Sequence, residues 1–244
     1  MTCSVYYIPK FLQAANLPLY PSGHCYVALK ICTHAVYADE QINHEINIYK
    51  HLSGINSMHQ GQAYIRILLD SFEITGTSGV VHQCLIHEPL ALDLASFQKL
   101  LEDRRGFPED LVRAYLRRLL RALDFLHSEA NIIHTDIKAT NIMLSIAEYA
   151  LLEDFVNDEM ATPSPRKILT DREIYLSRNF RNPTEEWGNS ILCDFGGARI
   201  GRQKFSHIVQ PAIYRAPEVV LNMDWDHKID IWNVGALVSG YYGM

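Results

Sequence analysis

The sequence has no pair of cysteines at the CxxC spacing that zinc sites and redox motifs use. Its five cysteines are an odd number, and its eleven histidines form no HExxH pattern. These absences argue against a disulfide framework and against a structural metal. They favour reduced, buried thiols in an intracellular protein.

The chain also lacks a long hydrophobic run and an excess of basic charge. No stretch approaches the roughly 18 apolar residues that a membrane helix needs. The first 20 residues carry one basic residue, so they do not resemble a signal peptide. With 28 acidic and 22 basic residues the net charge is −6, whereas proteins that bind nucleic acid over a broad surface are basic. We therefore expect no membrane anchor and no direct contact with nucleic acid.

The composition that remains is typical of a globular protein with a substantial core. The chain has 244 residues, 48% of them hydrophobic, enough for one large domain or two small ones. Strand formers dominate before Glu88 and helical patterns dominate after it. The predicted elements are strands at 25–32, 63–73 and 80–87 and helices at 39–52, 93–103 and 108–128. This order predicts an α+β fold with two lobes, over residues 1–88 and 89–244.

An acidic segment interrupts the second lobe. Residues 146–190 contain nine acidic and five basic residues, together with a Thr-Pro-Ser-Pro sequence at 162–165. Charged stretches of this length are typical of surface insertions. We expect this spacer to be partly ordered at best.

The most specific motif is the segment 134–141, HTDIKATN, which follows the predicted helix 108–128. A carboxylate, a lysine and an amide at this spacing can meet an attacking hydroxyl, neutralise a phosphoryl group and reach a nearby Mg²⁺. Taken alone, the segment favours this chemistry, with a polar loop after a helix as the alternative. Four further motifs accompany it in the chain: VALK ending at Lys30, CDFG at 193–196, YRAPE at 214–218 and DIWNVG at 230–235.

The helix predicted at 39–52 offers an independent check. Glu45 shares a face with Ile46 and Tyr49, and a carboxylate on an apolar face is costly unless it is paired. Lys30 lies on a strand that should pack against this face. An ion pair between Lys30 and Glu45 accounts for both residues.

With these motifs in order, the chain resembles the protein kinases, and among them the SR-protein kinases, particularly those of fungi. The resemblance covers residues 25–244 and is carried by four features. They are the HTD sequence, the length of the spacer, its sequences TPSPRK at 162–167 and IYLSR at 174–178, and the short activation segment that ends in IVQP at 208–211. It implies a two-lobed kinase fold. It also implies transfer of the γ-phosphate of ATP, with Mg²⁺, to serines of arginine/serine-rich splicing proteins.

The resemblance also implies roles for individual residues. Asp136 is expected to act as the base and Lys138 to steady the phosphoryl group, while Asn141 and Asp194 hold Mg²⁺. Lys30, paired with Glu45, is expected to bind the phosphates. The expected purine contacts are the Glu88 carbonyl and the Leu90 N–H at the hinge, the gatekeeper His87, and Ala28 and Met143 on the two faces of the ring. Ordinary core packing is the alternative for Ala28 and Met143.

Thr135 stands where most regulated kinases have an arginine that pairs with a phosphate on the activation loop. The segment 197–212 offers Ser206 as its single hydroxyl. We therefore predict that this protein is not activated by phosphorylation of that loop.

Two features depart from the family pattern. The stretch before Lys30 has one glycine, Gly23, no glycine-rich phosphate loop, and no resemblance to the strands expected in residues 1–24. The chain stops at Met244, within the predicted helix that starts near 230, so we expect a kinase domain shortened at both ends, with no partner for Glu218.

The alternative functions are a catalytically inactive kinase-like fragment or pseudokinase that acts by binding, and a nucleotide-binding module without transfer. By the same resemblance we expect a monomer in the cytoplasm and nucleus.

Overall fold

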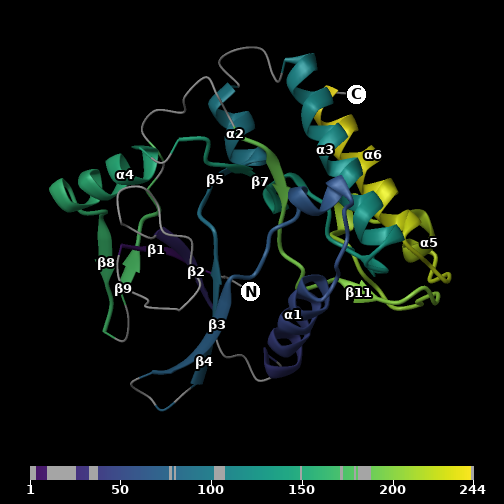
Figure 1. The fold of residues 1–244 in the computed structure, drawn as a ribbon, viewed down its shortest axis with the longest axis horizontal. Helices are drawn as coiled ribbons and strands as arrows, with labels where there is room; N and C mark the ends of the chain where they lie inside the picture. Colours follow the sequence, from purple (N-terminus) through teal and green to yellow (C-terminus); the bar gives the residue numbers. More distant parts are fainter. Residues whose placement is uncertain are drawn as a thin grey trace.

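Figure 1 shows the fold of the chain in a computed structural model. A sheet with one helix forms the first part, and helices dominate the second, so the predicted mixed α+β architecture is confirmed. The structure describes residues 4–9, 26–32, 38–76, 79, 81–101, 108–148, 150–170, 173–178, 180 and 188–242.

The elements follow the predicted order closely. The helices are α1 (Ala38–Ser53), α2 (Leu94–Leu101), α3 (Glu109–Ser128), α4 (Ala150–Ala161), α5 (Pro217–Val220) and α6 (Lys228–Tyr242), with short 3-10 helices η1 (Gln60–Tyr64), η3 (Ala139–Asn141) and η4 (Ala212–Tyr214). The strands are β1 (Ser4–Pro9), β2 (Tyr26–Ile31), β3 (Asp70–Thr75), β4 (Val81–His87), β5 (Leu90–Asp93), β6 (Ile132–Ile133), β7 (Ile142–Ser145), β8 (Arg166–Ile168), β9 (Glu173–Tyr175), β10 (Ser190–Leu192) and β11 (Arg199–Ile200). The three predicted helices are α1, α2 and α3, and two of the three predicted strands are β2 and β4.

The first sheet has the strand order β1-β2-β4-β3, with antiparallel neighbours throughout. Strand β1 pairs along the whole of β2, so the expectation that residues 1–24 resemble no strand of this lobe is wrong for residues 4–9. Their sequence, SVYYIP, is rich in β-branched and aromatic residues, but it lacks the polar–apolar alternation by which a half-buried strand is recognised. Gly23 lies outside the described residues.

The strand predicted at 63–73 begins later than expected, since η1 occupies residues 60–64 and β3 starts at Asp70. Gly61 accounts for part of the difference, because a side chain there would overlap the carbonyl of Arg121 on α3. The turn therefore packs its backbone directly against the helix. Ile65 follows it into the core, with a single parallel bridge to Leu192.

Helix α3 forms the centre of the second part of the molecule. Pro108 precedes it, and Glu109 and Asp110 lie in its first turn, where acidic side chains suit the helix dipole. One face of the helix is buried in a core that also includes side chains of α1, α2, β7, β10 and α6. The buried residues of α3 are Val112, Tyr115, Leu119, Ala122, Leu123, Phe125 and Leu126.

A second sheet, of order β10-β7-β5, brings the motifs together. Strand β7 begins directly after Asn141, and its antiparallel neighbour β10 ends two residues before Asp194. Asn141 and Asp194, the expected metal ligands, therefore lie on neighbouring segments at the same end of this sheet.

The spacer 146–190 contains helix α4 and the antiparallel hairpin of β8 and β9. Both lie on the left of Figure 1, away from α3 and α6. All six residues of the hairpin strands are exposed, whereas Leu152 of α4 is buried. The described part of the spacer therefore has regular structure on the surface of the molecule.

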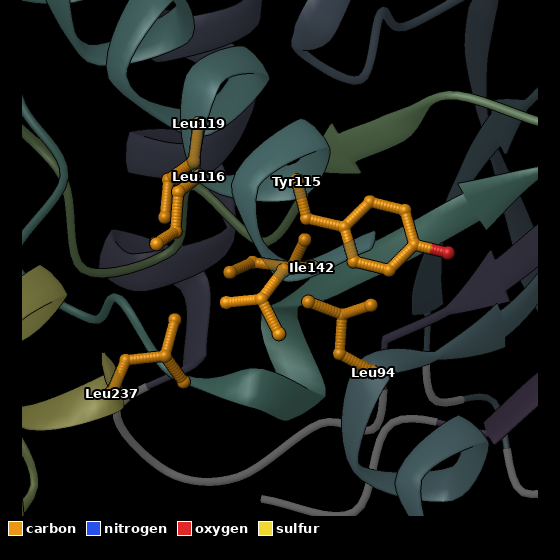
Figure 2. Close-up of a pocket in the computed structure, with 7 residues that line it drawn as sticks. Leu94, Tyr115, Leu116, Leu119, Ile142 and Leu237 are labelled. Atoms are coloured by element: carbon orange, nitrogen blue, oxygen red, sulfur yellow. The ribbon is translucent and has the colours of Figure 1, made fainter. Parts of the chain in front are cut away.

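Helices α2, α3 and α6 enclose a small cavity, shown in Figure 2. Its lining residues are Leu94, Val112, Tyr115, Leu116, Leu119, Ile142 and Leu237. The volume is about 10 Å³, which is at the lower limit for one water molecule. The cavity is a small packing defect in the core.

Three of the five cysteines lie in the part of the chain that the structure describes. Cys32, Cys84 and Cys193 are buried and form no disulfide, while Cys3 and Cys25 lie outside the described residues. Burial raises the pKa of the Cys193 thiol to about 11. Within the described ranges, no helix is long and apolar enough to cross a membrane.

The orientation of α3 can be tested by truncating one leucine on each face. Leu123→Ala removes a side chain that is 1% exposed, so the free energy of unfolding should fall by about 2–5 kcal/mol. Leu120→Ala, on the same helix and 46% exposed, should cost less than about 1 kcal/mol. Urea titrations of both variants give the comparison, and equal losses would contradict the orientation.

Candidate active site

A buried carboxylate on α6 holds the segment that resembles the catalytic loop. Asp230 has no exposed surface and accepts hydrogen bonds from the backbone N–H groups of His134 and Thr135, both at 2.8 Å. His127, at the end of α3, donates Nε2 to the same carboxylate at 2.9 Å. A buried carboxylate needs such donors, because it has lost its hydration. These bonds tie the loop to both long helices.

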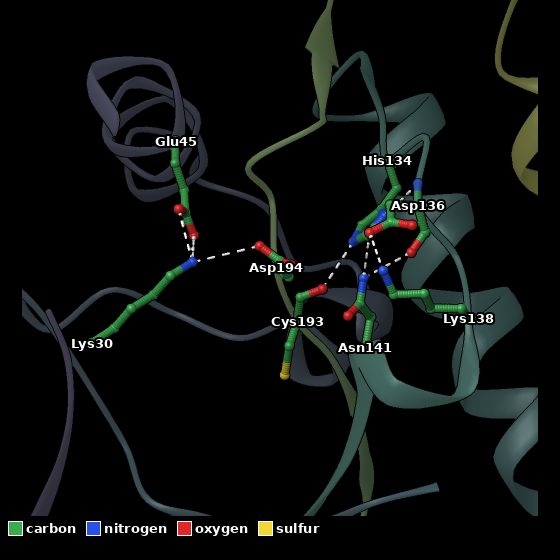
Figure 3. A network of polar contacts seen from close by, with 8 residues as sticks. All are labelled: Lys30, Glu45, His134, Asp136, Lys138, Asn141, Cys193 and Asp194. Carbon is green, nitrogen blue, oxygen red and sulfur yellow. Dashed lines mark hydrogen bonds and ion pairs between the residues drawn. The ribbon is translucent and has the colours of Figure 1, made fainter. Parts of the chain in front are cut away.

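The loop brings Asp136, Lys138 and Asn141 together, as Figure 3 shows. Lys138 Nζ and Asn141 Nδ2 donate to Asp136 Oδ2, at 2.8 and 2.9 Å, and the same amide donates to the Asp136 carbonyl. The two donors fix the orientation of the carboxylate. Its side chain is 23% exposed, so a substrate hydroxyl can approach it from solvent.

Lys30 and Glu45 form the ion pair that the sequence predicts. Lys30 Nζ lies 2.8 and 2.9 Å from the two carboxylate oxygens of Glu45, which is buried on α1. The same ammonium group lies 3.5 Å from Asp194 Oδ1. One cation therefore connects β2, α1 and the segment after β10 (Figure 3).

The charge of Asp194 is stabilised by its surroundings. Burial alone would raise the pKa of its carboxyl, but Lys30, His134 and the Gly196 N–H outweigh this effect and hold the pKa below its usual value. Asp194 is therefore a carboxylate at neutral pH, the form that a cation site requires.

An aromatic chain connects α1 to the loop. The ring of Phe195 lies between those of Tyr49 and His134, with centroid distances of 5.5 and 5.1 Å. His134 Nε2 also donates to the Cys193 carbonyl at 3.0 Å. The position of α1, and with it Glu45, thus depends on packing against the segment that carries Asp194.

The residues expected to contact the purine lie where the two sheets meet. Ala28 is buried on β2 opposite His87 of β4, and Glu88 and Leu90 follow that strand. Met143 lies on β7, the neighbour of β5. Glu88 and Leu90 thus lie at the passage from the first sheet to the second, next to the pair of Ala28 and His87, while Met143 lies opposite Asp93 of β5. The contacts of all five residues with a nucleotide remain predictions. A further contact there was not predicted: Arg66 Nη2 lies 3.3 Å from the Glu88 carbonyl oxygen.

The donor set suits a hard divalent cation. Asn141 turns its amide nitrogen to Asp136, which leaves its amide oxygen for another partner, and Asp194 is ionised. Amide and carboxylate oxygens are ligands that Mg²⁺ accepts, with water and phosphate oxygens completing the shell. Asn141 and Asp194 supply two such oxygens, so they fit a Mg²⁺ whose other ligands are water and phosphate oxygens.

The segment that resembles the activation segment is held by hydrogen bonds from uncharged side chains and from the guanidinium groups of Arg199 and Arg215. Buried Gln210 donates to the Ile229 carbonyl at 2.8 Å and to Asn233 Oδ1 at 2.9 Å, and accepts from the Ala216 N–H at 2.8 Å. At its start, the Thr135 hydroxyl donates to the Gly197 carbonyl at 2.9 Å. Thr135 and Gln210 thus position the two ends of this segment.

Some of the supporting residues were not identified as functional from the sequence. The sequence motif marks Asp230 only as the start of a helix, although an acidic side chain in the first turn of an apolar helix is itself a signal of a structural role. Gln210 and Arg66 show no such signal, because Gln210 bonds to Ile229 and Asn233 and Arg66 bonds to Glu88, all about twenty residues away in the chain.

His87 should make stability depend on pH. It is 1% exposed, and burial, with Arg66 and Lys30 nearby, lowers its pKa to about 3, although its bond to the Ile67 carbonyl opposes this. Below pH 6.5 the unfolded chain gains a proton that the folded chain does not, so stability falls. Between pH 7 and pH 5 this amounts to about 2 kcal/mol.

The His87→Phe variant should lose this part of the pH dependence. Urea titrations at pH 7 and pH 5 should show a loss smaller by about 2 kcal/mol than in the wild type. His82→Phe, on the same strand, is the control for removal of a histidine. An unchanged difference between the two pH values in His87→Phe would contradict the buried neutral imidazole.

Comparisons with known proteins agree with this geometry. A family model described as "Protein kinase domain" matches residues 21–242. A serine/threonine protein kinase of Aspergillus fumigatus is 42% identical over 217 residues, which are 88% of this chain and 50% of the relative. The serine/threonine-protein kinase SRPK of Physarum polycephalum is 31% identical over 235 residues (87% and 53%), and the dual specificity protein kinase CLK1 of Homo sapiens is 27% identical over 225 residues (91% and 40%).

The chain spans about half the length of the curated relatives it matches. The family match nevertheless covers almost the whole sequence, and it includes each of the segments assembled around Lys30, Asp136 and Asp194. The chain belongs to the protein kinase family.

Proposed function

We propose that the protein is a serine/threonine protein kinase that transfers the γ-phosphate of ATP to serines of arginine/serine-rich splicing proteins. The observation that carries the proposal is the assembly of Lys30, Glu45 and Asp194 opposite Asp136 and Asn141 (Figure 3). Four segments of the chain contribute these groups, and phosphoryl transfer needs all of them together.

In this proposal the substrate hydroxyl oxygen attacks the γ-phosphorus, the bond from that phosphorus to the β,γ-bridging oxygen breaks, and ADP leaves. Asp136 accepts the hydroxyl proton, since its carboxylate is oriented by two donors and open to solvent. Lys138 offsets negative charge on the transferring group. Mg²⁺, held by Asn141 and Asp194, would neutralise phosphate charge.

Two observations favour an arginine/serine-rich substrate. One is the resemblance of the motifs and the spacer to SR-protein kinases, with a relative that bears the name SRPK. The other is the excess of acidic residues in the spacer 146–190, which would attract a basic peptide. In the same proposal residues 1–88 and 89–244 are the two lobes, and the protein works as a monomer in the cytoplasm and nucleus.

Activity can be tested with purified protein, ATP, Mg²⁺ and a peptide of alternating arginine and serine. Asp136→Asn should lower kcat by about 10²–10⁴-fold, because it removes the base while it keeps the size of the side chain. Asp124→Asn, which changes an exposed carboxylate on α3, is the matched control and should behave as the wild type. Transfer that is no faster in the wild type than in Asp136→Asn would exclude kinase activity and favour the role as a binding protein.

The substrate class is tested separately. A peptide in which glutamate replaces each arginine should be phosphorylated with a kcat/KM at least about tenfold lower, since the proposed attraction is electrostatic. Equal kcat/KM values for the two peptides would refute the arginine/serine preference and leave the kinase activity intact.

Activity should not depend on a phosphate in the segment 197–212. Phosphatase treatment and the Ser206→Ala substitution should each leave kcat within about twofold of the untreated protein, because Thr135 and Gln210 hold the segment with neutral bonds. Loss of activity after phosphatase treatment, reproduced by Ser206→Ala, would contradict this prediction.

A further inference from the structure

The sequence TPSPRK at 162–167 has no role in the proposed reaction. It connects the end of α4 to strand β8, and residues 163–165 have neither helical nor strand structure. Thr162, Pro163 and Pro165 are exposed, and Ser164 between the prolines is half-buried. The chain thus presents a serine, followed by proline and two basic residues, in a short surface connection.

A carboxylate holds this serine in place. Glu159, in the last turn of α4, accepts hydrogen bonds from the Ser164 N–H and hydroxyl, both at 2.7 Å. Arg178, which follows β9, donates Nε to the same carboxylate at 2.6 Å and also bonds the Thr162 carbonyl. The Ser164 N–H, the Ser164 hydroxyl and the Arg178 guanidinium together lower the pKa of the Glu159 carboxyl to about 2. The Glu159 carboxylate therefore links α4 to residues 162–165 and to the segment that follows β9.

We propose that Ser164 is a phosphorylation site for a proline-directed protein kinase, and that its phosphate releases the hairpin of β8 and β9 from α4. In the modifying enzyme, the Ser164 oxygen attacks the γ-phosphorus of ATP, ADP leaves, and the hydroxyl proton passes to that enzyme's catalytic base. Pro165 defines the class of enzyme, because it lacks the N–H that an ordinary extended substrate offers at that position.

The release follows from the charges. Phosphorylation converts the hydroxyl from a donor to Glu159 into a group of charge about −1.5 to −2 beside that carboxylate. Phosphate and Glu159 then compete for one guanidinium, that of Arg178. The site also lies next to the C-terminal end of α4, where the helix dipole disfavours an anion. The bond from the Leu176 N–H to the Pro165 carbonyl, at 2.9 Å, couples the hairpin to the same connection.

The modification is tested on the full chain with a purified cyclin-dependent kinase, ATP and Mg²⁺. The Asp136→Asn background removes any self-phosphorylation. Phosphate should appear on Ser164 by mass spectrometry, remain in Thr162→Val, and fall at least tenfold in Ser164→Ala and in Pro165→Ala. A synthetic peptide of residues 158–168 serves as the unfolded substrate. Label on Thr162 alone, no label on either substrate, or label on the peptide but not on the folded chain would each overturn the proposal.

The release is tested by hydrogen–deuterium exchange of residues 166–176. Phosphorylated protein should exchange at least about tenfold faster there than unmodified protein, while α3 exchanges at its original rate. Glu159→Gln, which keeps the shape of the side chain but removes its charge, should reproduce part of the increase without phosphate. Unchanged exchange in the phosphorylated protein would overturn the proposed release.

Discussion

The carboxylate of Asp230 is the contact on which the site depends. It has no exposed surface, and its oxygens accept hydrogen bonds from two backbone N–H groups and one imidazole. Those N–H groups belong to the two residues before Asp136, so the bonds that satisfy the buried carboxylate also position the proposed base. The Asp230 carboxylate loses its hydration in the core, and the hydrogen bonds that replace this hydration fix the position of the loop that carries Asp136.

The two parts of the molecule meet through a chain of packed rings and one ammonium group. Tyr49 of α1 touches Phe195, Phe195 touches His134, and Lys30 contacts both Glu45 and Asp194. A displacement of α1 would therefore disturb both the packing of Tyr49 on Phe195 and the ion pair between Lys30 and Glu45. Because packed side chains resist small gradual shifts, this arrangement favours a site that is either assembled or not.

Much of this could be predicted from the sequence, because local patterns specify it. The helices α1 and α3 follow from their apolar stripes, and the pair of Lys30 and Glu45 follows from a carboxylate on an apolar face. Strand β3 starts later than predicted in part because Gly61 lets a turn approach the backbone of α3, a contact visible only in three dimensions. The role of Gln210 could not be predicted for the same reason, since its partners on α6 are about twenty residues away.

Three residues at the site, Thr135, Asp194 and Gln210, have positive φ angles of 69°, 66° and 66°. None is glycine, so each conformation costs on the order of 1–3 kcal/mol that surrounding contacts must offset. The backbone conformation at these residues is therefore imposed by tertiary contacts and is not the one that each residue prefers by itself. As the protein is warmed, the site should lose its geometry in a local opening before the helical core melts, so that the limit of function lies below the limit of folding.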